Sequence, residues 1–365
     1  MTQPTVYVTI TNHGFGHAAR TAAVAGMIQQ LNPEIKLIIT TTAPRWLIAS
    51  YISGDFVYRP LGYDVGVIQA DSLNMNLPAT IAKWQDIIDR QEEIVRSEAS
   101  FLKEQQVNLV LADIPPLAPL IAHRANVPCW AATNFGWDFI YRDWGEDFAD
   151  ITDWISSCYQ QCDRLFRLPM HESLNRFTVI EDVGLTGGQP RYEIAELQEK
   201  LGFTHPQDKT ALLVFGGLGL QAIPYHNLSN FPDWQFLTFD KAAPSFPNLH
   251  PIPDPSGTDL GQHYRPVDLF PLCGLVVSKP GYTTYAEAMM ANVPIATILR
   301  QGFAESAKLL EGLQDHSPHQ IITDHDFFDG QWDFLSQPTQ TARTGQAYRT
   351  DGTETIAQAV VKYLS

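Results

Sequence analysis

The sequence is poor in several features that assign a chain quickly to a class of protein. In 365 residues it has 4 cysteines and no apolar run that approaches the length of a membrane span. Its amino terminus has no basic segment followed by an apolar one, so we expect no secretory leader. These absences predict a cytoplasmic protein with reduced thiols.

Positive charge is also scarce. The chain has 24 Lys and Arg against 40 Asp and Glu, a formal net charge of -16. Nucleic acids and anionic lipid surfaces are held by clusters of Lys and Arg, so the composition argues against both as partners. An anionic substrate therefore requires a local pocket of backbone N–H groups and a few cations.

Residues that bind metals do not come together in a motif. Cys158 and Cys162 are one helical turn apart, but no second Cys/His pair with ligand spacing accompanies them. Cys129 and Cys273 lie in apolar or helix-like contexts. We expect neither a metal ion nor another cofactor.

Strand-like and helix-like segments alternate along the chain. The first half is expected to contain strands at 6–10, 36–42, 107–113 and 127–134 and helices at 19–31, 81–104 and 117–126. After a Gly/Pro-rich passage, the second half is expected to contain strands at 210–214, 234–239, 274–279 and 293–299 and a helix at 285–292. Apolar strands separated by helices predict an α/β fold with parallel sheets covered on both faces. Because this alternation begins again after the Gly/Pro-rich passage, the sequence predicts two domains joined near residue 185. Ligands are expected beyond the carboxyl ends of the strands.

The segment SKPGYTTYAEAMMANVPI (278–295) predicts an anion site. A strand runs into a turn through Gly281, and a helix begins near Thr283. The first N–H groups of that helix and the hydroxyls of Thr283 and Thr284 point out of its positive end, where a phosphate is stabilised. Glu287, on the same face, is placed to accept hydrogen bonds from ribose. The alternative is a threonine N-cap followed by a solvated glutamate.

A second glycine-containing turn follows the first strand. The stretch VYVTITNHGFGHAAR (6–20) carries two histidines, His13 and His17. It lacks the G-x-G-x-x-G spacing of a dinucleotide-binding turn, since Gly14 and Gly16 are followed by His17. This strand is therefore expected to present something other than a pyrophosphate site.

Residues 264–287 resemble the nucleotide-sugar box of glycosyltransferases of the GT-B fold, which have two facing Rossmann-like domains. The run 279–284, KPGYTT, stands where plant members have His-Cys-Gly-Trp-Asn-Ser, and Glu287 stands where they have a Glu three residues later. Tyr264 takes the place of the Trp that stacks on uracil. FGGLG (215–219) resembles the turn whose backbone faces the diphosphate.

The resemblance implies that the donor substrate is a UDP-sugar, and it implies a set of residues that bind this donor. These donor-binding residues are Gly216, Gly217, Tyr264, Arg265, Lys279, Gly281, Tyr282, Thr283, Thr284, Glu287 and Glu305. The chain departs from the family at two of its positions. Lys279 replaces the phosphate-binding His, although a lysine still neutralises a diphosphate. Val267 replaces a Gln, which leaves the base and the sugar open.

In the same family a catalytic histidine follows a glycine just after the first strand, and Gly16-His17 matches that position. The resemblance implies an inverting transfer in which His17, as a neutral imidazole, takes the proton of an acceptor hydroxyl. Asp113, at the end of the predicted strand 107–113, matches the aspartate that orients this histidine.

Several polar and aromatic residues near the predicted strand ends suit the hydroxyls of an acceptor. The candidate acceptor-binding residues are His13, Phe15, Asp71, Asn134, Trp137 and Asp138, and Gln69 shares the loop of Asp71. The alternatives are a packed Trp137, a capping Asp138 and a His13 that only bonds its loop.

The implied architecture has an acceptor domain at 1–185, a donor domain at 186–350 and a carboxyl-terminal helix at 351–365 that returns to the first domain. The acidic run DHD (324–326) mimics the metal-binding pair of the other major transferase fold. We expect a loop there, because that fold does not fit two repeated βα halves.

The chain also resembles the amino-terminal half of plant L-arabinokinases. The matching segments are NHGFGHAAR (12–20), VIQADSL (67–73), TNFGWDFIY (133–141) and GQW (330–332). The sugar kinase activity belongs to the other half of those fusions, which nothing in this chain resembles. The resemblance therefore leaves the reaction unnamed.

Three other functions stay open. A retaining transferase typically carries a second glutamate eight positions after the first, where this chain has Ile295. A UDP-sugar epimerase or hydrolase would need more carboxylates near the anomeric centre than the sequence places there. A sensor that binds nucleotide sugars without catalysis is the third.

Overall fold

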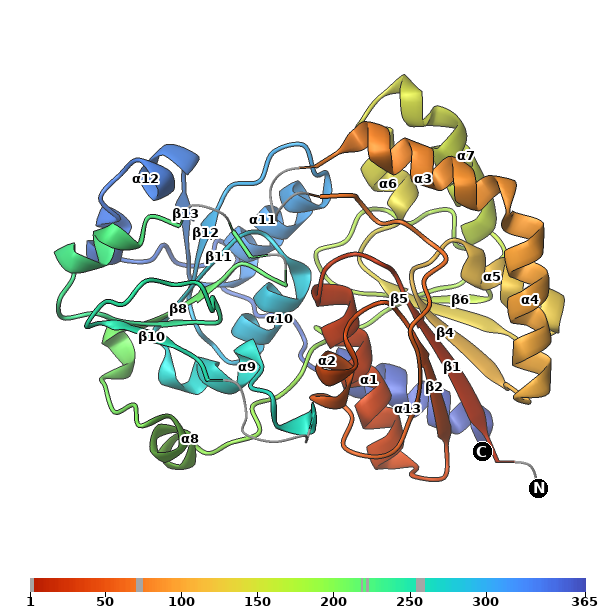
Figure 1. Ribbon diagram of the computed structural model, residues 1–365, viewed down its shortest axis with the longest axis horizontal. Coiled ribbons are helices and arrows are strands. Elements are labelled where there is room, and N and C mark those ends of the chain that lie inside the picture. Colours follow the sequence, from red (N-terminus) through yellow and green to blue (C-terminus); the bar gives the residue numbers. More distant parts are fainter. Residues whose placement is uncertain (1–2, 70–74, 218, 221–222, 254–259) are drawn as a thin grey trace.

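The protein is built of two parallel sheets that lie side by side, each with helices packed on it (Figure 1). This computed structural model describes residues 3–69, 75–217, 219–220, 223–253 and 260–365. Within them the strand order is β3-β2-β1-β4-β5-β6-β7 in the first sheet and β10-β9-β8-β11-β12-β13 in the second. The predicted α/β fold with two parallel sheets is confirmed.

The elements follow one another in the alternation that the sequence predicts. The first sheet contains β1 (Thr5–Ile10), β2 (Lys36–Thr40), β3 (Val57–Arg59), β4 (Leu109–Asp113), β5 (Cys129–Thr133), β6 (Arg164–Arg167) and β7 (Ile180–Asp182). The second contains β8 (Thr210–Val214), β9 (Gln235–Thr238), β10 (Leu249–Pro251), β11 (Leu275–Ser278), β12 (Ile295–Ile298) and β13 (His319–Ile322).

The α-helices of the first half are α1 (Gly16–Leu31), α2 (Arg45–Ala49), α3 (Leu77–Asp89), α4 (Gln91–Glu104), α5 (Leu117–Ala125), α6 (Trp137–Arg142) and α7 (Ala149–Tyr159). Those of the second half are α8 (Ile194–Leu201), α9 (Pro266–Leu269), α10 (Tyr282–Met290), α11 (Glu305–His316) and α12 (Asp324–Phe328), and α13 (Gly352–Leu364) ends the chain.

Strand β1 shows why the first sheet forms. All its residues are buried, and β-branched residues fit a pleated strand that is covered on both faces. Val6 and Val8 point into a core shared with α1, while Tyr7 points into a separate core shared with α4 and α5. Because the strands run parallel, the carboxyl ends of β1 and β4 meet at one edge, where Ile10 pairs with Asp113.

Two local predictions are wrong. The amphipathic segment 81–104 is not one helix, because α3 ends at Asp89 and α4 starts at Gln91. Helix α3 also begins before this segment, where the side chain of Asn76 caps it by accepting from the N–H of Ala79. Residues 324–326, expected as a loop, begin the short helix α12. The Thr323 hydroxyl caps it by accepting from the N–H of Asp326, which is the usual role of a threonine at this position.

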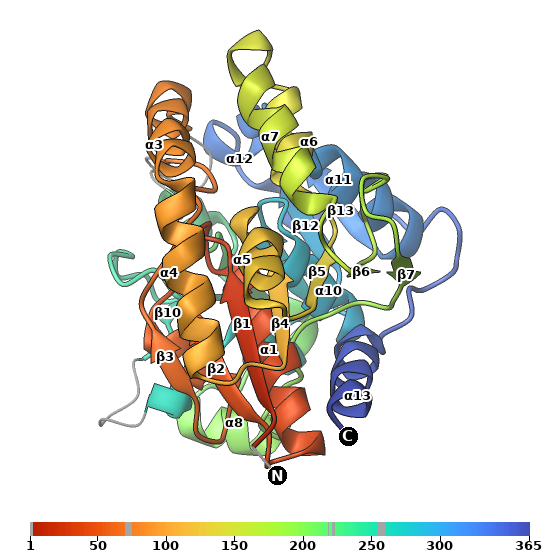
Figure 2. The same cartoon turned by 90° about the vertical axis from the view of Figure 1, so that its right-hand side faces the viewer.

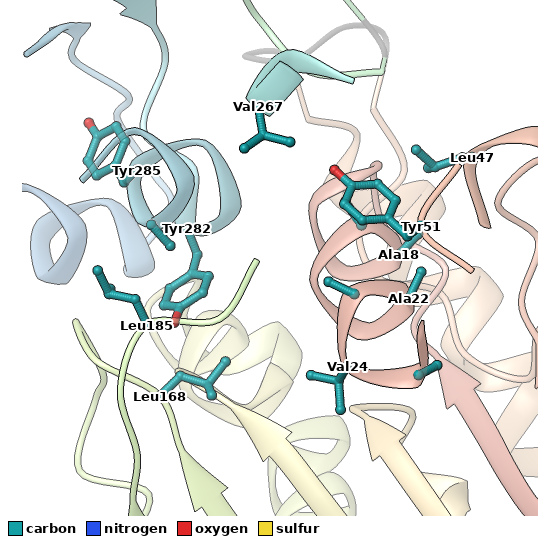
Figure 3. Close-up of a cluster of buried hydrophobic side chains, with 14 of the residues drawn as sticks. Ala18, Ala22, Val24, Leu47, Tyr51, Leu168, Leu185, Val267, Tyr282 and Tyr285 are labelled. Atoms are coloured by element: carbon teal, nitrogen blue, oxygen red, sulfur yellow. The ribbon is translucent and has the colours of Figure 1, made fainter. Parts of the chain in front are cut away.

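The two halves share a continuous apolar core. Figure 3 shows side chains of this cluster from both sides of the junction, with Ala18, Val24 and Tyr51 from the first half facing Tyr282 and Val267 from the second. Helices α1 and α10 are in contact there. The halves are therefore held together by apolar burial as well as by the polar contacts described below.

The last helix, α13, packs on α1 of the first half, as the views of Figures 1 and 2 agree. The chain crosses itself where α13 begins: Gly352 N–H donates to the Leu185 carbonyl at 3.1 Å, and Leu185 N–H donates to the Arg349 carbonyl at 2.7 Å. We propose that the domain boundary lies at this crossing, near residue 185. Within the described residues no helix is long and apolar enough to cross a membrane.

Replacing Gly352 tests how tightly this crossing is packed. A Cβ atom at this position would overlap the backbone carbonyl of Gly184, which has no rotamer by which to move away. We expect Gly352→Ala to lower the free energy of unfolding by about 1–3 kcal/mol, the usual cost of overpacking. Urea denaturation measures it, with Gln358→Ala on the exposed face of α13 as the control. Equal stability of the two variants would contradict the tight crossing.

Candidate active site

The side chains of His17 and Asp113 meet at the edge where β1 and β4 end. His17 lies in the first turn of α1, and its Nδ1 is 2.8 Å from Oδ1 of Asp113, the last residue of β4. Both are buried, with exposed fractions of 7% and 1%. Because an ionised carboxylate only accepts hydrogen bonds, Nδ1 donates to Asp113, and in the neutral imidazole Nε2 is then the nitrogen that can accept a proton. This is the arrangement of an oriented general base.

Sequence analysis missed the third member of this group, Arg20. It follows His17 by three residues on α1, and its Nε and Nη2 donate to Oδ2 and Oδ1 of Asp113 at 2.6 and 2.7 Å. Thr21 also donates to Asp113 Oδ2, at 2.8 Å. Burial alone would raise the pKa of Asp113, but the charge of Arg20 and these hydrogen bonds outweigh it and hold the pKa well below its usual range.

A chain of hydrogen bonds leads from Arg20 into the second half. Arg20 Nη1 donates to Asn134 Oδ1 at 2.8 Å, and Asn134 Nδ2 donates to Glu305 Oε1 at 2.8 Å. Glu305 is the first residue of α11. The predicted acceptor residue Asn134 and the predicted donor residue Glu305 are thus bonded to each other, and they connect the dyad to the donor half.

The amino terminus of α10 faces the amino terminus of α1. Gly281 precedes α10, and the Thr283 hydroxyl donates to the Gly16 carbonyl at 2.8 Å. On the neighbouring Gly216–Gly217 turn, a Cβ at Gly217 would meet the ring of Phe15 at 2.5 Å. Phe15, predicted to bind the acceptor, therefore packs on the donor turn. Thr284 is half-buried in the first turn of α10.

Glu287 is buried rather than solvated, so the alternative of a solvated glutamate is wrong. Its exposed fraction is 2%, and Oε1 accepts from the N–H of Gly188 at 2.8 Å and from the Tyr51 hydroxyl at 3.2 Å. Burial raises the pKa of Glu287 to about 7, although Gly188 N–H and the charge of Arg265 oppose the rise. Its role toward ribose stays a prediction.

Three predicted donor residues have protein partners. Arg265 forms a buried ion pair with Asp268 at 2.7 Å, and it also donates to the Gln189 carbonyl. Tyr282 is buried, and its hydroxyl accepts from the N–H of Thr186 at 3.2 Å. These contacts supply the hydrogen bonds that buried polar groups need, and the roles of both residues toward a donor stay predictions. Tyr264 is half-buried against the ring of Tyr192.

The predicted acceptor residues divide into two groups. His13 lies against the rings of Trp137 and Phe303, with centroid distances of 5.1 and 5.8 Å. Trp137 Nε1 donates to Thr11 Oγ1 at 2.9 Å. Loss of hydration and the neighbouring positive charges hold the pKa of His13 well below its usual range, so it is neutral at pH 7.

Asp138 belongs to the other group. Its carboxylate is buried and ion-paired with Arg176 at 2.8 Å, and its role toward an acceptor stays a prediction. Asp71 lies outside the described residues. Gln69, from the same loop, forms an isolated antiparallel bridge with Met75.

Two cations, Lys279 and Arg300, stand at the carboxyl ends of the neighbouring strands β11 and β12. Burial, together with the charge of Arg300, lowers the pKa of Lys279 to about 7, partly offset by Glu305. Burial lowers the pKa of Arg300 to about 10, again against Glu305. Sequence analysis missed Arg300, although its place directly after the predicted strand 293–299 was an available signal.

No three His, Cys, Asp or Glu side chains gather as a possible metal site in the described part of the chain. The groups suited to hold an anionic ligand are the amino terminus of α10, the Gly216–Gly217 turn and the pair Lys279 and Arg300.

The fold is that of GT-B glycosyltransferases. Solved structures with this fold include UGT89C1 of Arabidopsis thaliana with quercetin (TM-score 0.62, 11% identity, 100% of each chain) and with UDP-L-rhamnose (TM-score 0.60, 12% identity, 100% of each chain). The spinosyn forosaminyltransferase SpnP is similar at a TM-score of 0.57, with 13% identity over 99% of this chain and 96% of its own.

Among curated proteins the chain is similar to L-arabinokinase of Arabidopsis thaliana. The two are 26% identical over 329 residues, which is 88% of this chain and 31% of that protein. The chain thus spans about a third of the length of this relative. No protein-family profile matches the chain.

Removing Arg20 should leave Asp113 as a buried charge without its main partner. We expect Arg20→Met to lower the free energy of unfolding by about 3–5 kcal/mol, as when one member of a buried ion pair is deleted. Adding Asp113→Asn removes the uncompensated charge, so the double variant should recover part of the loss in urea denaturation. Additive losses would contradict a coupled pair.

Lys279 should make stability depend on pH. Its pKa in the folded protein, about 7, lies below the ordinary value of 10.5, so between these values the unfolded chain binds more protons. The free energy of unfolding therefore rises with pH in this window, by at most about 1.4 kcal/mol per pH unit. The loss of stability caused by burying the protonated Lys279 is largest below pH 7 and becomes smaller as the pH rises.

Urea denaturation between pH 7 and 9 measures this contribution. Lys279→Gln should flatten the rise, while the exposed Lys308→Gln should keep it. The groups facing Lys279, which are His13, Arg300 and Glu305, remain in both variants. Identical slopes in the two variants would show that Lys279 is hydrated like an ordinary lysine.

Proposed function

We propose that this protein transfers a sugar from a nucleoside-diphosphate sugar, a UDP-sugar, to an acceptor hydroxyl with inversion at the anomeric carbon. The observation that carries the proposal is the hydrogen bond of His17 Nδ1 to Asp113, on the edge that faces the amino terminus of α10. One side offers an oriented base and the other a positive helix end. These are the two groups that a displacement with a diphosphate leaving group requires.

In the proposed reaction the acceptor oxygen attacks the anomeric carbon while its proton passes to Nε2 of His17. The bond from that carbon to the phosphoryl oxygen breaks, and its electron pair leaves with the diphosphate. Asp113 keeps the imidazole in the tautomer that accepts the proton, and it stays ionised because Arg20 and Thr21 hold it. The developing charge on the diphosphate faces α10 and Lys279.

The choice of a uridine donor draws on the solved relatives. Structures of UGT89C1 hold UDP, UDP-L-rhamnose or quercetin. By analogy the donor would lie on the second half, at Gly216, Gly217, Lys279, Gly281, Thr283, Thr284, Glu287 and Glu305. The acceptor would enter beside His13 and Trp137. We propose that the transfer needs no metal ion.

Replacing the histidine tests the proposal. His17→Ala should lower kcat about 10²–10⁴-fold and leave donor affinity near wild type, because the donor is bound by the other half. Asp113→Asn should act in the same direction through a misoriented imidazole, and the double variant should be little worse than His17→Ala. Turnover is measured with labelled UDP-sugars, and donor affinity by calorimetry.

His13→Ala is the matched control, since this imidazole lies beside His17 and is expected to affect mainly the KM of the acceptor. If His13→Ala abolishes turnover and His17→Ala does not, the base is wrongly assigned. Donor binding without any product would favour the sensor, and release of free sugar or an isomerised donor would favour the hydrolase or epimerase. Retention at the anomeric carbon would exclude the inverting mechanism.

A further inference from the structure

Arg300 is buried, and among the described residues its guanidinium has no hydrogen-bond or ion-pair partner. Its exposed fraction is 8%, and its Nε and Nη2 are enclosed and make no hydrogen bond. No ion pair or hydrogen bond joins it to any residue that the structure describes. A guanidinium has five N–H donors, and buried polar groups in folded proteins nearly always have partners. The packing of the chain therefore does not account for this side chain.

Lys279 adds a second cation to the same place. Ser278 pairs with Thr297 across β11 and β12, so Lys279 and Arg300 leave the same edge of the sheet from adjacent strands. Lys279 is half-buried and, among the described residues, has neither an ion pair nor a hydrogen bond. Two buried like charges repel each other, so this edge carries an excess of positive charge.

The nearby acid offsets only part of this charge. Glu305 opposes the lowering of both pKa values, but it is one carboxylate beside two cations, and its Oε1 also accepts from Asn134 Nδ2 at 2.8 Å. The hydroxyls of Ser278, at the end of β11, and Ser306, in the first turn of α11, are also buried without hydrogen bonds. The edge of β11 and β12 thus gathers several polar groups whose hydrogen bonds the described chain does not supply.

The pair lies close to the proposed reaction. The guanidinium carbon of Arg300 is 3.9 Å from the centre of the Phe303 ring, which also stacks on His13. The His13 ring centre is 6.3 Å from that of His17. Lys279 precedes the first residue of α10 by three positions. The cations therefore lie near the histidines and near the positive end of α10.

We propose that Arg300 and Lys279 together bind the phosphoryl group of the donor that is bonded to the transferred sugar. This rests on the proposed function and names a binding residue, Arg300, that the nucleotide-sugar box does not contain. When the bond from the anomeric carbon to the phosphoryl oxygen breaks, the electron pair stays on that oxygen and the charge it carries faces both cations. A planar guanidinium suits two phosphoryl oxygens at once.

Calorimetry with nucleotides that differ by this phosphoryl group tests the proposal. UDP, GDP and ADP are titrated to find the preferred nucleotide, and its diphosphate is then compared with its monophosphate. Arg300→Gln should weaken binding of the diphosphate about 10- to 100-fold, the effect of charged hydrogen bonds, and leave the monophosphate unchanged. The control is Arg343→Gln, which removes the same charge from an exposed ion pair with Asp315.

A second measurement separates this role from a structural one. Arg300 and Arg265 are both buried, but Arg265 is paired with Asp268. Without nucleotide, Arg300→Met should melt at the same temperature as wild type or higher, because it removes an uncompensated buried charge. Arg265→Met should melt lower. The rise in Tm that the diphosphate produces in wild type should shrink in Arg300→Met.

Three results would overturn the proposal. The first is an unchanged ratio of diphosphate to monophosphate affinity in Arg300→Gln. The second is a lower Tm of nucleotide-free Arg300→Met, which would make Arg300 structural. The third is weaker binding of UDP-glucuronate with unchanged binding of UDP and UDP-glucose, which would assign the site to a sugar carboxylate.

Failure of the proposed function gives a different pattern. If the affinity ratio depends on Arg300 but no sugar is transferred, the phosphoryl site stands and the transfer is wrong. If transfer occurs and the ratio of diphosphate to monophosphate affinity does not change when Arg300 is replaced, the transfer stands and this site is wrong. Binding of none of the three diphosphates would overturn both.

Discussion

The buried contact of Arg20 with Asp113 is the interaction on which the rest of the site depends. Taking two charges out of water is costly, and it is offset only where the geometry and further hydrogen bonds are good. Here Arg20 donates twice to the carboxylate, and His17 and Thr21 complete its shell. Because all three donor residues lie in the first turns of α1, one carboxylate fixes both the helix on the sheet edge and the orientation of the histidine.

The same arginine connects the base to the arrangement of the two halves. Through Asn134 it reaches Glu305 on α11, and its guanidinium lies over the ring of Tyr282 on α10 at 4.9 Å. A change in the position of the second half relative to the first therefore changes the contacts of Arg20, the main partner of Asp113. Under the proposed transfer, contiguous hydrogen bonds couple the packing of the donor side to the orientation of the base.

Most of the strands could be predicted from the sequence, because buried parallel strands appear as apolar runs whose ends are marked by a glycine or an acidic residue. The sequence also pointed to His17 and Asp113, through the resemblance to glycosyltransferases and because Asp113 ends a predicted strand. It could not find Arg20, since an arginine on a helix is usually exposed. It also could not place the hydrogen bond of Arg265 to the Gln189 carbonyl or the ion pair of Asp138 with Arg176, because only the fold brings these partners near.

The buried arginines differ in whether the chain balances their charge. Arg20 and Arg265 are each neutralised by an aspartate, so their charges are balanced within the chain. Arg300 is not, in a protein whose formal net charge is -16. Under the proposed transfer, the carboxylate that orients the imidazole is balanced within the chain, while the leaving-group side keeps positive charge for the departing diphosphate. In that proposal the unpaired cation and the paired dyad are two parts of one mechanism.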